Sequence, residues 1–471
     1  MFHLAYHTQK IKDETPVSVF ERVRSDYAVL LQSGKEERYS FIGYQPFLMM
    51  TSKDDVQHVS AFHYLKDEVV ADVQMLTCDT LGLLQGFMDQ MKIAKVPKDL
   101  PPFVGGAMGF MSYEFGLKMQ GIIPMNADDV DAPDAHYCFY DKVVAFDHEK
   151  KLLYFFGVAE SKAKAQKLAK EVQYEATEGL GEYVSDFAGV RSSKNPPKDF
   201  DVFLDRETYV QKISKIKQHL KKGETYQVNF SYRFGFETEE DPFEIYKRMV
   251  ELNPSPSACY FDFPEMRVMS CSPERLVSLQ GDALVTRPIK GTRPRGKDAS
   301  EDKKMEGELL SSKKDEAELS MIVDLMRNDF GKICVPKSVK VMNHREIQKY
   351  SHVMHTVSTV VGKLKKGLSF ADVIAATFPG GSVTGCPKKR TMEIIHDLEE
   401  FHRDVYCGSA GYLSMSGNMD LNILIRTLLW KEGTVHFHSG GGIVMDSDAQ
   451  QEFEETLHKA QILINALIPK L

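Results

Sequence analysis

The fold class follows first from the stretch 137-YCFYDKVVAFDHEKKLLYFFGV-158, in which two apolar runs flank the charged turn HEKK. This pattern is typical of a β-hairpin, because a short polar turn lets two consecutive strands pair antiparallel. Upstream, residues 27–50 contain two more strand-like runs around a polar turn. A doubly wound parallel sheet would instead require strands that alternate regularly with helices. The sequence therefore predicts an α+β fold with antiparallel sheets.

The rest of the chain mixes further helices and strands in irregular order. Helices are expected at residues 160–178, 206–222, 241–252, 300–330 and about 447–467. Strands are expected at residues 226–237, 258–263, 267–271, 283–287, 421–430 and 434–438. The polar segment 187-FAGVRSSKNPPKDFD-201 contains two consecutive prolines and is the predicted linker. It divides the chain into two predicted domains, residues 1–190 and 200–471.

The composition is that of an ordinary globular protein: of 471 residues, 42% are hydrophobic and 27% are charged, and the net charge is -8. A mildly acidic chain has no electrostatic reason to bind nucleic acid or an anionic membrane. The seven cysteines are scattered without a CxxC pair, so neither a zinc site nor a disulfide framework is indicated. The sequence contains no signal-peptide core and no membrane-length apolar run, so a cytoplasmic location is expected.

Two glycine-rich segments resemble phosphate-binding loops without matching them. The segment 380-GGSVTGCPKK-389 has glycines at the right spacing, but Cys386 and Pro387 replace the required lysine and hydroxyl residue. The segment 440-GGGIVMD-446 lacks the third glycine of a dinucleotide fingerprint. Bare backbone N–H groups in both segments are nevertheless suited to bind a carboxylate.

Acidic residues lie on two of the predicted helices. Glu452 and Glu455 are three positions apart and share one helix face, and Glu318 precedes the apolar stripe of another helix. On spacing alone, solvated helix carboxylates are the favoured interpretation. The alternative is a Mg²⁺ ion held by these carboxylates together with water and substrate oxygens.

Lys290 has unusual neighbours in the stretch 286-TRPIKGTRPRG-296. Most lysines are exposed surface cations, and this is the default interpretation. However, the preceding residues are strand-like, and Gly291 permits a close approach of the backbone. A lysine in a desolvated site loses its proton more easily and can act as a nucleophile. Upstream, Glu274 in 271-CSPERL-276 could stay protonated in an enclosed site and act as a general acid.

In their order along the chain, eight motifs resemble those of the chorismate-utilising enzymes, a family that includes anthranilate, aminodeoxychorismate, isochorismate and salicylate synthases. The match runs from about residue 205 to the C-terminus and comprises SPERL, PIKGTRPRG, ELSMIVDLMRND, FPGGSVTGCPK, CGSAGYLS, IRT, GGGIV and EFEET. The N-terminal third is similar to the family's amino-terminal domain through LLQSG and YSFIGYQP. The resemblance implies a large α/β sandwich of two antiparallel-rich sheets, with helices outside and the active site in the cleft between the sheets.

The resemblance also implies a substrate site. Glu318 and Glu455 would coordinate Mg²⁺ and Glu452 would assist through water, so that the ion holds the ring carboxylate of chorismate. Arg426 would bind the enolpyruvyl carboxylate with its planar guanidinium group. The other implied contacts with chorismate are Gly291, Thr292, His355, Thr384, Tyr406 and the backbone of Gly440, Gly441 and Gly442. For His355, an ordinary hydrogen-bonded core histidine is the alternative.

Two positions distinguish the reactions of this family. Where this chain reads PIKGT at residues 288–292, aminodeoxychorismate synthases resemble PIKGT and anthranilate synthases resemble PIAGT. Isochorismate and salicylate synthases place a water-activating lysine where this chain has Gln227, so addition of water is disfavoured. The resemblance implies that neutral Lys290 attacks ring C2 while Glu274 protonates the departing 4-hydroxyl group. Ammonia then adds at C4 and expels the lysine, which gives the 4-amino-4-deoxychorismate of p-aminobenzoate and folate biosynthesis.

The ammonia requires a source, and the sequence contains no amidotransferase nucleophile of the GxCxGxQ type. The resemblance implies a separate glutamine amidotransferase subunit that forms a heterodimer with this chain. Ser33 and Pro256 match the tryptophan-binding elements of anthranilate synthases, although Gln32 and Ala258 replace a glutamate and a methionine. A feedback-inhibition site and a vestigial pocket are both compatible with this pattern. Anthranilate synthase component I is the alternative function. A non-catalytic sensor that keeps only the amino-acid pocket is the second alternative, and retention of all the candidate site residues together argues against it, namely Glu274, Lys290, Glu318, Arg426 and Glu455.

Overall fold

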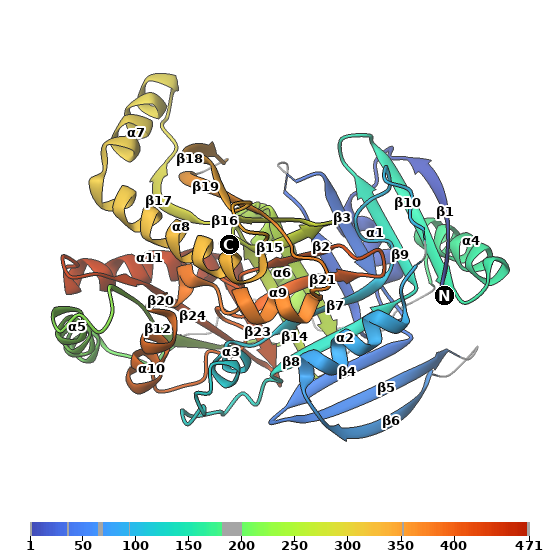
Figure 1. Ribbon diagram of the computed structural model, residues 1–471, viewed down its shortest axis with the longest axis horizontal. Helices are drawn as coiled ribbons and strands as arrows, with labels where there is room; N and C mark the ends of the chain where they lie inside the picture. Colours follow the sequence, from blue (N-terminus) through green and yellow to red (C-terminus); the bar gives the residue numbers. More distant parts are fainter. Residues whose placement is uncertain are drawn as a thin grey trace.

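Two large antiparallel sheets form the centre of the protein, and helices pack around their outside (Figure 1). The computed structural model describes residues 2–34, 37–64, 69–93, 95–180, 200–350 and 353–468. Each sheet has 12 strands, and all the pairings between these named strands are antiparallel. The predicted α+β fold with two antiparallel-rich sheets is therefore confirmed.

The two sheets are called the first and the second sheet. In the first sheet the strand order is β1 (His3–Lys10), β10 (Leu152–Ala159), β9 (Lys142–Asp147), β3 (Tyr39–Gly43), β2 (Ala28–Gln32), β13 (Ser257–Phe263), β14 (Met266–Ser272), β23 (Thr427–Lys431), β24 (Thr434–Ile443), β12 (Gln227–Glu237) and β11 (Asp201–Val202), with β20 (Gly385–Cys386) paired to β12. In the second sheet it is β17 (Ile289–Pro294), β19 (Val353–Lys363), β16 (Ala283–Arg287), β15 (Arg275–Gln280), β22 (Met419–Asn422), β21 (Ser409–Ser414), β7 (Gly106–Met111), β8 (Ala135–Tyr140), β4 (Leu48–Lys53), β5 (Val56–Tyr64) and β6 (Val69–Thr77), with β18 (Lys340–Lys349) paired to β19.

The helices cover both ends of this framework, with α4 against β1 and β10, and with α10 and α11 against β12 and β24 (Figure 1). They are α1 (Pro16–Val23), α2 (Thr80–Gln90), α3 (Tyr113–Met119), α4 (Lys162–Glu178), α5 (Arg206–Lys221), α6 (Pro242–Leu252), α7 (Ala299–Ser311), α8 (Lys313–Ile333), α9 (Phe370–Thr377), α10 (Lys388–Leu398) and α11 (Ala449–Leu467). Within the described ranges, none of these helices is both long enough and apolar enough to cross a membrane.

The hairpin predicted within residues 137–158 is present as β9 and β10, whose pairing starts with Asp147 opposite Leu152. The first residues of the stretch belong to β8 of the second sheet, so the chain changes sheets between β8 and β9. Both strands of the hairpin are almost fully buried, because α4 packs on β10. Gly157 makes this packing close, since a Cβ atom there would lie 2.4 Å from the backbone nitrogen of Ala169.

Both sheets combine strands from the two predicted domains. In the first sheet β2 pairs with β13, and Gln32 lies opposite Ala258. In the second sheet β7 pairs with β21, and Met111 lies opposite Ser409. The predicted linker 187–201 lies outside the described residues as far as residue 199. The division into two domains stays a prediction, while the two regions share one framework of sheets.

Three predicted elements have different limits in the structure. The helix expected at 300–330 is two helices, α7 and α8, because Ser312 caps the second: its hydroxyl oxygen accepts a hydrogen bond from the Asp315 backbone N–H at 3.2 Å. The strand expected at 421–430 is divided into β22 and β23 by a segment in which Arg426 has a φ of 53°. The last strand, β24, extends beyond residue 438 through the glycine run to Ile443.

Two of the segments that carry the chain from one sheet to the other contain candidate site residues. One joins β14 to β15 and includes Glu274, and the other joins β22 to β23 and includes Arg426. The backbone N–H of Ile423 donates a hydrogen bond to the carbonyl oxygen of Glu274 at 2.9 Å, and that of Cys271 donates to the carbonyl of Arg426 at 3.1 Å. The sheets are therefore linked where these two side chains lie.

Candidate active site

Lys290 on β17 and Glu274 in the β14–β15 crossing lie in one electrostatic environment. Glu274 is 5% exposed, and among the described residues its Oε1 atom has no hydrogen-bond partner. Burial raises the pKa of Glu274 to about 7, although Ser382 and the charge of Lys290 counteract this rise in part. The carbonyl oxygen of Lys290 accepts a hydrogen bond from the Thr356 hydroxyl, which ties β17 to β19. A carboxylic acid that keeps its proton close to neutral pH therefore lies near the Lys290 side chain.

His355 on β19 is held by Thr292 on β17, since Thr292 Oγ1 lies 2.8 Å from His355 Nδ1. Burial and the charge of Arg426 lower the pKa of His355 to about 4, so its ring is neutral at neutral pH. Arg426 and His355 both line a small cavity. The guanidinium group of Arg426 donates one hydrogen bond to Asn253 Oδ1, at 3.3 Å. Three of the predicted substrate contacts thus lie together.

The predicted metal-binding carboxylates lie on α8 and α11. The Nζ atom of Lys314 lies 4.0 Å from Glu318 of its own helix and 3.9 Å from Glu452 of α11, so the two acids share one counter-ion. Glu452 is 6% exposed, whereas Glu455 is exposed and pairs with Lys459 at 2.8 Å. Sequence spacing alone gave no indication of this relationship; the structure places Lys314 of α8 within 3.9 Å of Glu452 on α11.

The charges around these acids include the candidate nucleophile. Burial raises the pKa of Glu318, and the charges of Lys290 and Lys314 oppose this rise. For Glu455, partial desolvation by the surrounding chain raises the pKa, but the lysines around it, Lys459 foremost, lower it more strongly. The charge of Lys290 acts on Glu318, on Glu455 and on Glu274, so Lys290 lies near all three acids.

The chemistry of the three carboxylates suits a Mg²⁺ ion, although in the described residues their donor atoms do not all lie within 4.8 Å of one another. The carboxylates offer only oxygen donor atoms, which are the ligands that Mg²⁺ prefers. A Mg²⁺ ion usually takes only a few of its ligands from the protein. Gly441 brings β24 close to the cluster, since a Cβ atom there would lie 3.5 Å from Oε2 of Glu452. An ion held by Glu318, Glu452 and Glu455 would therefore lie beside the glycine run.

The glycine run is required by packing as well. A Cβ atom at Gly440 would lie 2.2 Å from the carbonyl oxygen of Phe230 on β12, and one at Gly442 would lie 2.3 Å from Nε2 of Gln227. Gln227 is fully buried, and neither polar atom of its amide has a hydrogen-bond partner in the part of the chain that the structure describes. Position 227 is the one at which the sequence comparison predicted a lysine in enzymes that add water, and here it holds a buried amide.

Thr384 and Tyr406 are buried and engaged within the protein. The Thr384 hydroxyl donates a hydrogen bond to the Gly380 carbonyl at 3.0 Å, and the Thr384 carbonyl accepts one from the Asn229 backbone N–H at 3.0 Å. Tyr406 stacks on His438 with the ring centroids 5.4 Å apart. Both residues support β12 and β24, and their direct contact with substrate stays a prediction.

The predicted tryptophan-pocket residues line a separate cavity of about 350 Å³. Ser33 and Pro256 both contribute to its wall, together with Gln32 and Ala258 from the β2–β13 pairing. The backbone N–H of Ser33 donates a hydrogen bond to Ser40 Oγ at 3.0 Å. The structure brings these residues together, and tryptophan binding stays a prediction.

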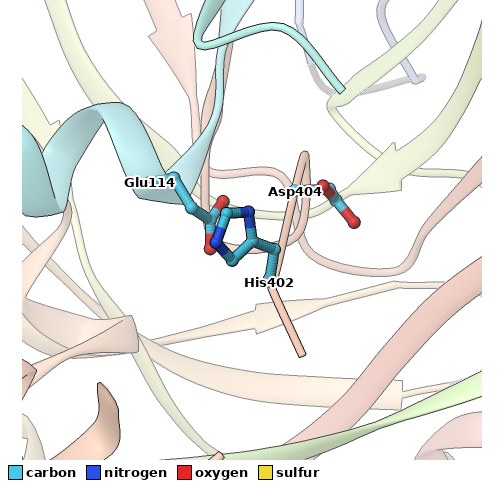
Figure 2. Close-up of side chains that lie close together, drawn as sticks. All are labelled: Glu114, His402 and Asp404. Atoms are coloured by element: carbon cyan, nitrogen blue, oxygen red, sulfur yellow. The ribbon is translucent and has the colours of Figure 1, made fainter. Parts of the chain in front are cut away.

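A further cluster, Glu114, His402 and Asp404, was not predicted (Figure 2). Each residue offers one donor atom, and the three atoms lie within 4.8 Å of one another. Glu114 lies on α3, and the other two follow α10, so they are far apart in the sequence. No local spacing could have revealed them, because only the fold brings the two segments together.

Comparison with known proteins identifies the family. The family model described as chorismate binding enzyme matches residues 27–465, and the chain belongs to this family. The aminodeoxychorismate synthase component 1 of Bacillus subtilis (strain 168) is 35% identical over 442 residues, which are 93% of this chain and 91% of that protein. The anthranilate synthase component 1 of Acetivibrio thermocellus is 34% identical over 466 residues, which are 96% of this chain and 93% of that protein.

A solved structure supports the same assignment. The crystal structure of anthranilate synthase component I from Streptococcus pneumoniae TIGR4 aligns with a TM-score of 0.78 at 30% identity, and the alignment covers 97% of this chain and 98% of that one. The protein is therefore a chorismate-binding enzyme with the anthranilate synthase fold. The two kinds of synthase are similar to it at nearly equal identity, so identity alone does not select the reaction.

Proposed function

We propose that this protein is component I of an aminodeoxychorismate synthase and aminates chorismate at C4 with ammonia. The observation that carries the proposal is Lys290 beside a buried Glu274 whose pKa is about 7. An alanine, which the resemblance gives to anthranilate synthases at position 290, offers no nucleophile. A lysine at this place, next to a carboxyl group that holds a proton, supplies both groups that a covalent displacement requires.

The proposed reaction has two displacements. The Nζ atom of Lys290 forms a bond to ring C2, the double bond shifts, and the C4–oxygen bond breaks as Glu274 gives its proton to the departing hydroxyl group, which leaves as water. Ammonia then forms a bond to C4, the double bond shifts back, and the C2–nitrogen bond to Lys290 breaks. The carboxylate of Glu274 takes up the proton that the new amino group loses. The enolpyruvyl group is retained, and the product is 4-amino-4-deoxychorismate.

Binding would use the carboxylates of the substrate. Glu318, Glu452 and Glu455 would hold Mg²⁺, which when bound supplies positive charge for the ring carboxylate. Arg426 would bind the enolpyruvyl carboxylate through the part of its guanidinium group that Asn253 leaves available. The neutral imidazole of His355, kept in place by Thr292, would contact the ring without adding a charge.

The ammonia would come from a glutamine amidotransferase subunit. The relatives of both kinds carry names that end in component 1, which supports a two-component enzyme. Free ammonium at high concentration would replace this partner in the test tube, so the chain can be assayed alone.

Anthranilate synthase component I is the second candidate, and the cavity lined by Ser33 and Pro256 is the observation in its favour. Incubation with chorismate, Mg²⁺ and ammonium, followed by mass spectrometry, separates the two. Accumulation of 4-amino-4-deoxychorismate without pyruvate is the expected result. Release of anthranilate and pyruvate would overturn the proposal.

A further inference from the structure

The cluster of Glu114, His402 and Asp404 lies outside the candidate active site. Figure 2 shows the carboxylate of Glu114 next to the imidazole ring of His402, with the carboxylate of Asp404 on the other side. One donor atom of each lies within 4.8 Å of the other two. The cluster joins the N-terminal end of α3 to the segment between α10 and β21.

Two donor atoms of this cluster have no hydrogen-bond partner among the described residues. Glu114 is 5% exposed; its Oε1 atom accepts a hydrogen bond from the Arg403 backbone N–H at 2.8 Å, but its Oε2 atom has no partner. The Nε2 atom of His402 also lacks one. A buried polar atom without a partner is costly, so an unsatisfied pair at one point indicates a missing ligand.

The other ring nitrogen of His402 is directed by a carboxylate. His402 Nδ1 lies 3.4 Å from Oδ1 of Asp128. Histidines that bind metals commonly donate their second N–H to a carboxylate in this way, which fixes the ring and leaves the opposite nitrogen for the ion. The opposite nitrogen, Nε2, has no hydrogen-bond partner among the described residues.

The neighbouring cations are already paired with other acids. Arg403 forms its ion pair with Glu399 at 2.7 Å, and Lys53 forms one with Asp128 at 2.6 Å. In the described ranges, neither Glu114 nor Asp404 forms an ion pair. Two buried carboxylates at such short separation repel each other unless a positive charge or a shared proton lies between them.

We propose that Glu114, His402 and Asp404 bind a divalent transition-metal cation of the Zn²⁺ type. One imidazole nitrogen and two carboxylate oxygens suit such an ion, and the two carboxylates balance its charge. The donor set differs from the all-oxygen cluster of α8 and α11, so the two sites would select different metals. The ion would have a structural role, because it joins the N-terminal third to the segment that carries Arg403.

Arg403 connects the proposed metal site to β12 and β24, the strands that flank the candidate active site. Its guanidinium group donates hydrogen bonds to the carbonyl oxygens of Asn229 at 2.6 Å and Val383 at 3.2 Å. Asn229 in turn lies opposite Gly442 in the β12–β24 pairing. A metal ion bound next to Arg403 would therefore stabilise β12 and β24, the strand pair that contains the glycine run.

Metal content and thermal unfolding of the full chain test the proposal. The protein is stripped with a chelator, incubated with ZnCl₂ and freed of excess by gel filtration. We expect wild type to retain stoichiometric zinc by mass spectrometry and to unfold at a higher temperature than the stripped protein. Glu114→Gln keeps the shape of the side chain but removes its charge, and both effects should be lost. With Co²⁺ in place of zinc, wild type should show visible absorption that His402→Gln lacks.

Two control variants distinguish this site from its neighbours. Glu318→Gln alters the α8–α11 carboxylates and should leave zinc retention at this cluster unchanged. Asp128→Asn keeps all three ligands but loosens the ring, and should weaken zinc binding by about 10- to 100-fold. Equal zinc retention in wild type and Glu114→Gln would overturn the proposal. So would an absence of zinc from wild type combined with a higher unfolding temperature of stripped Glu114→Gln, because the three groups would then share a proton.

Discussion

The buried carboxyl group of Glu274 and the side chain of Lys290 belong to different chain segments, yet the charge of the lysine acts directly on the pKa of the acid. Glu274 lies where the chain passes from the first sheet to the second, and Lys290 lies on a strand of the second sheet. Their proximity is thus a product of the sheet crossing and not of local sequence. It gives the proposed reaction its nucleophile and its acid in one place.

Removal of the Lys290 amine should abolish amination. In Lys290→Ala, we expect the rate of 4-amino-4-deoxychorismate formation to fall by more than about a hundredfold, because the covalent route is lost. The measurement is product formation from chorismate and ammonium by mass spectrometry. Lys340→Ala, which changes an exposed lysine on β18, is the matched control and should be unaffected. An unchanged rate in Lys290→Ala would exclude the covalent route.

Loss of the acid should change both the rate and its dependence on pH. Glu274→Gln cannot donate a proton, so we expect a fall in rate of about 100- to 10,000-fold. In wild type the rate should decline as pH rises through about 7, where Glu274 loses its proton. The residual activity of Glu274→Gln should lack this decline. If the variant shows the same decline, another group is responsible for it.

The same group should affect stability in a defined pH window. The folded protein holds the Glu274 proton up to about pH 7, whereas an ordinary glutamic acid, with a pKa of 4.5, loses its proton well below that pH. Between these values the native state binds more protons than the unfolded state, so the free energy of unfolding falls as pH rises. Relative to Glu274→Gln, wild type should lose about 3 kcal/mol across this window.

Chemical unfolding of both proteins at several pH values measures this difference, since groups common to the two proteins cancel. The difference should be constant below the unfolded pKa and again above the folded pKa. A difference that does not vary with pH would mean that Glu274 titrates normally.

The α8–α11 carboxylates should determine the response to magnesium. Glu318→Gln and Glu452→Gln should each raise the Mg²⁺ concentration needed for half-maximal activity by at least about tenfold, because each removes an oxygen ligand and a charge. Glu454→Gln is the matched control on α11, since Glu454 is exposed and pairs with Arg206 at the surface. Equal Mg²⁺ requirements in all three variants would contradict the proposed ligand set.

Arg426 should act on binding more than on chemistry. Arg426→Lys keeps the charge but loses the planar pair of donors, so we expect the KM for chorismate to rise about tenfold or more with a smaller change in kcat. Steady-state kinetics at saturating Mg²⁺ measure both parameters. An unchanged KM would show that Arg426 does not contact the substrate.

Sequence patterns predicted the helices and strands that depend mainly on residues near them in the chain. The hairpin of β9 and β10 was visible because its turn is charged and its strands are apolar. By contrast, residues 289–294 (IKGTRP) contain proline and glycine, and no strand was predicted over this range. They form β17 because they pair with β19, with Lys290 opposite Thr356, a contact far away in the chain.

The candidate site shows the same limit. The positions of Glu318 and Glu452 could be named from motifs, but only the fold shows that Lys314 lies between them. No sequence motif predicted the cluster of Glu114 with His402, because the two residues are far apart in the chain. A site that depends on contacts between distant segments cannot be predicted from the local spacing of residues.

The pairing of β2 with β13 has a consequence for the order of folding during synthesis. One edge of β2 stays unpaired until β13 (residues 257–263) has left the ribosome. One edge of β7 stays unpaired until β21 (residues 409–414) has left it. An open strand edge readily pairs with another chain. Until then each open edge can pair with another chain, and neither half completes a sheet by itself.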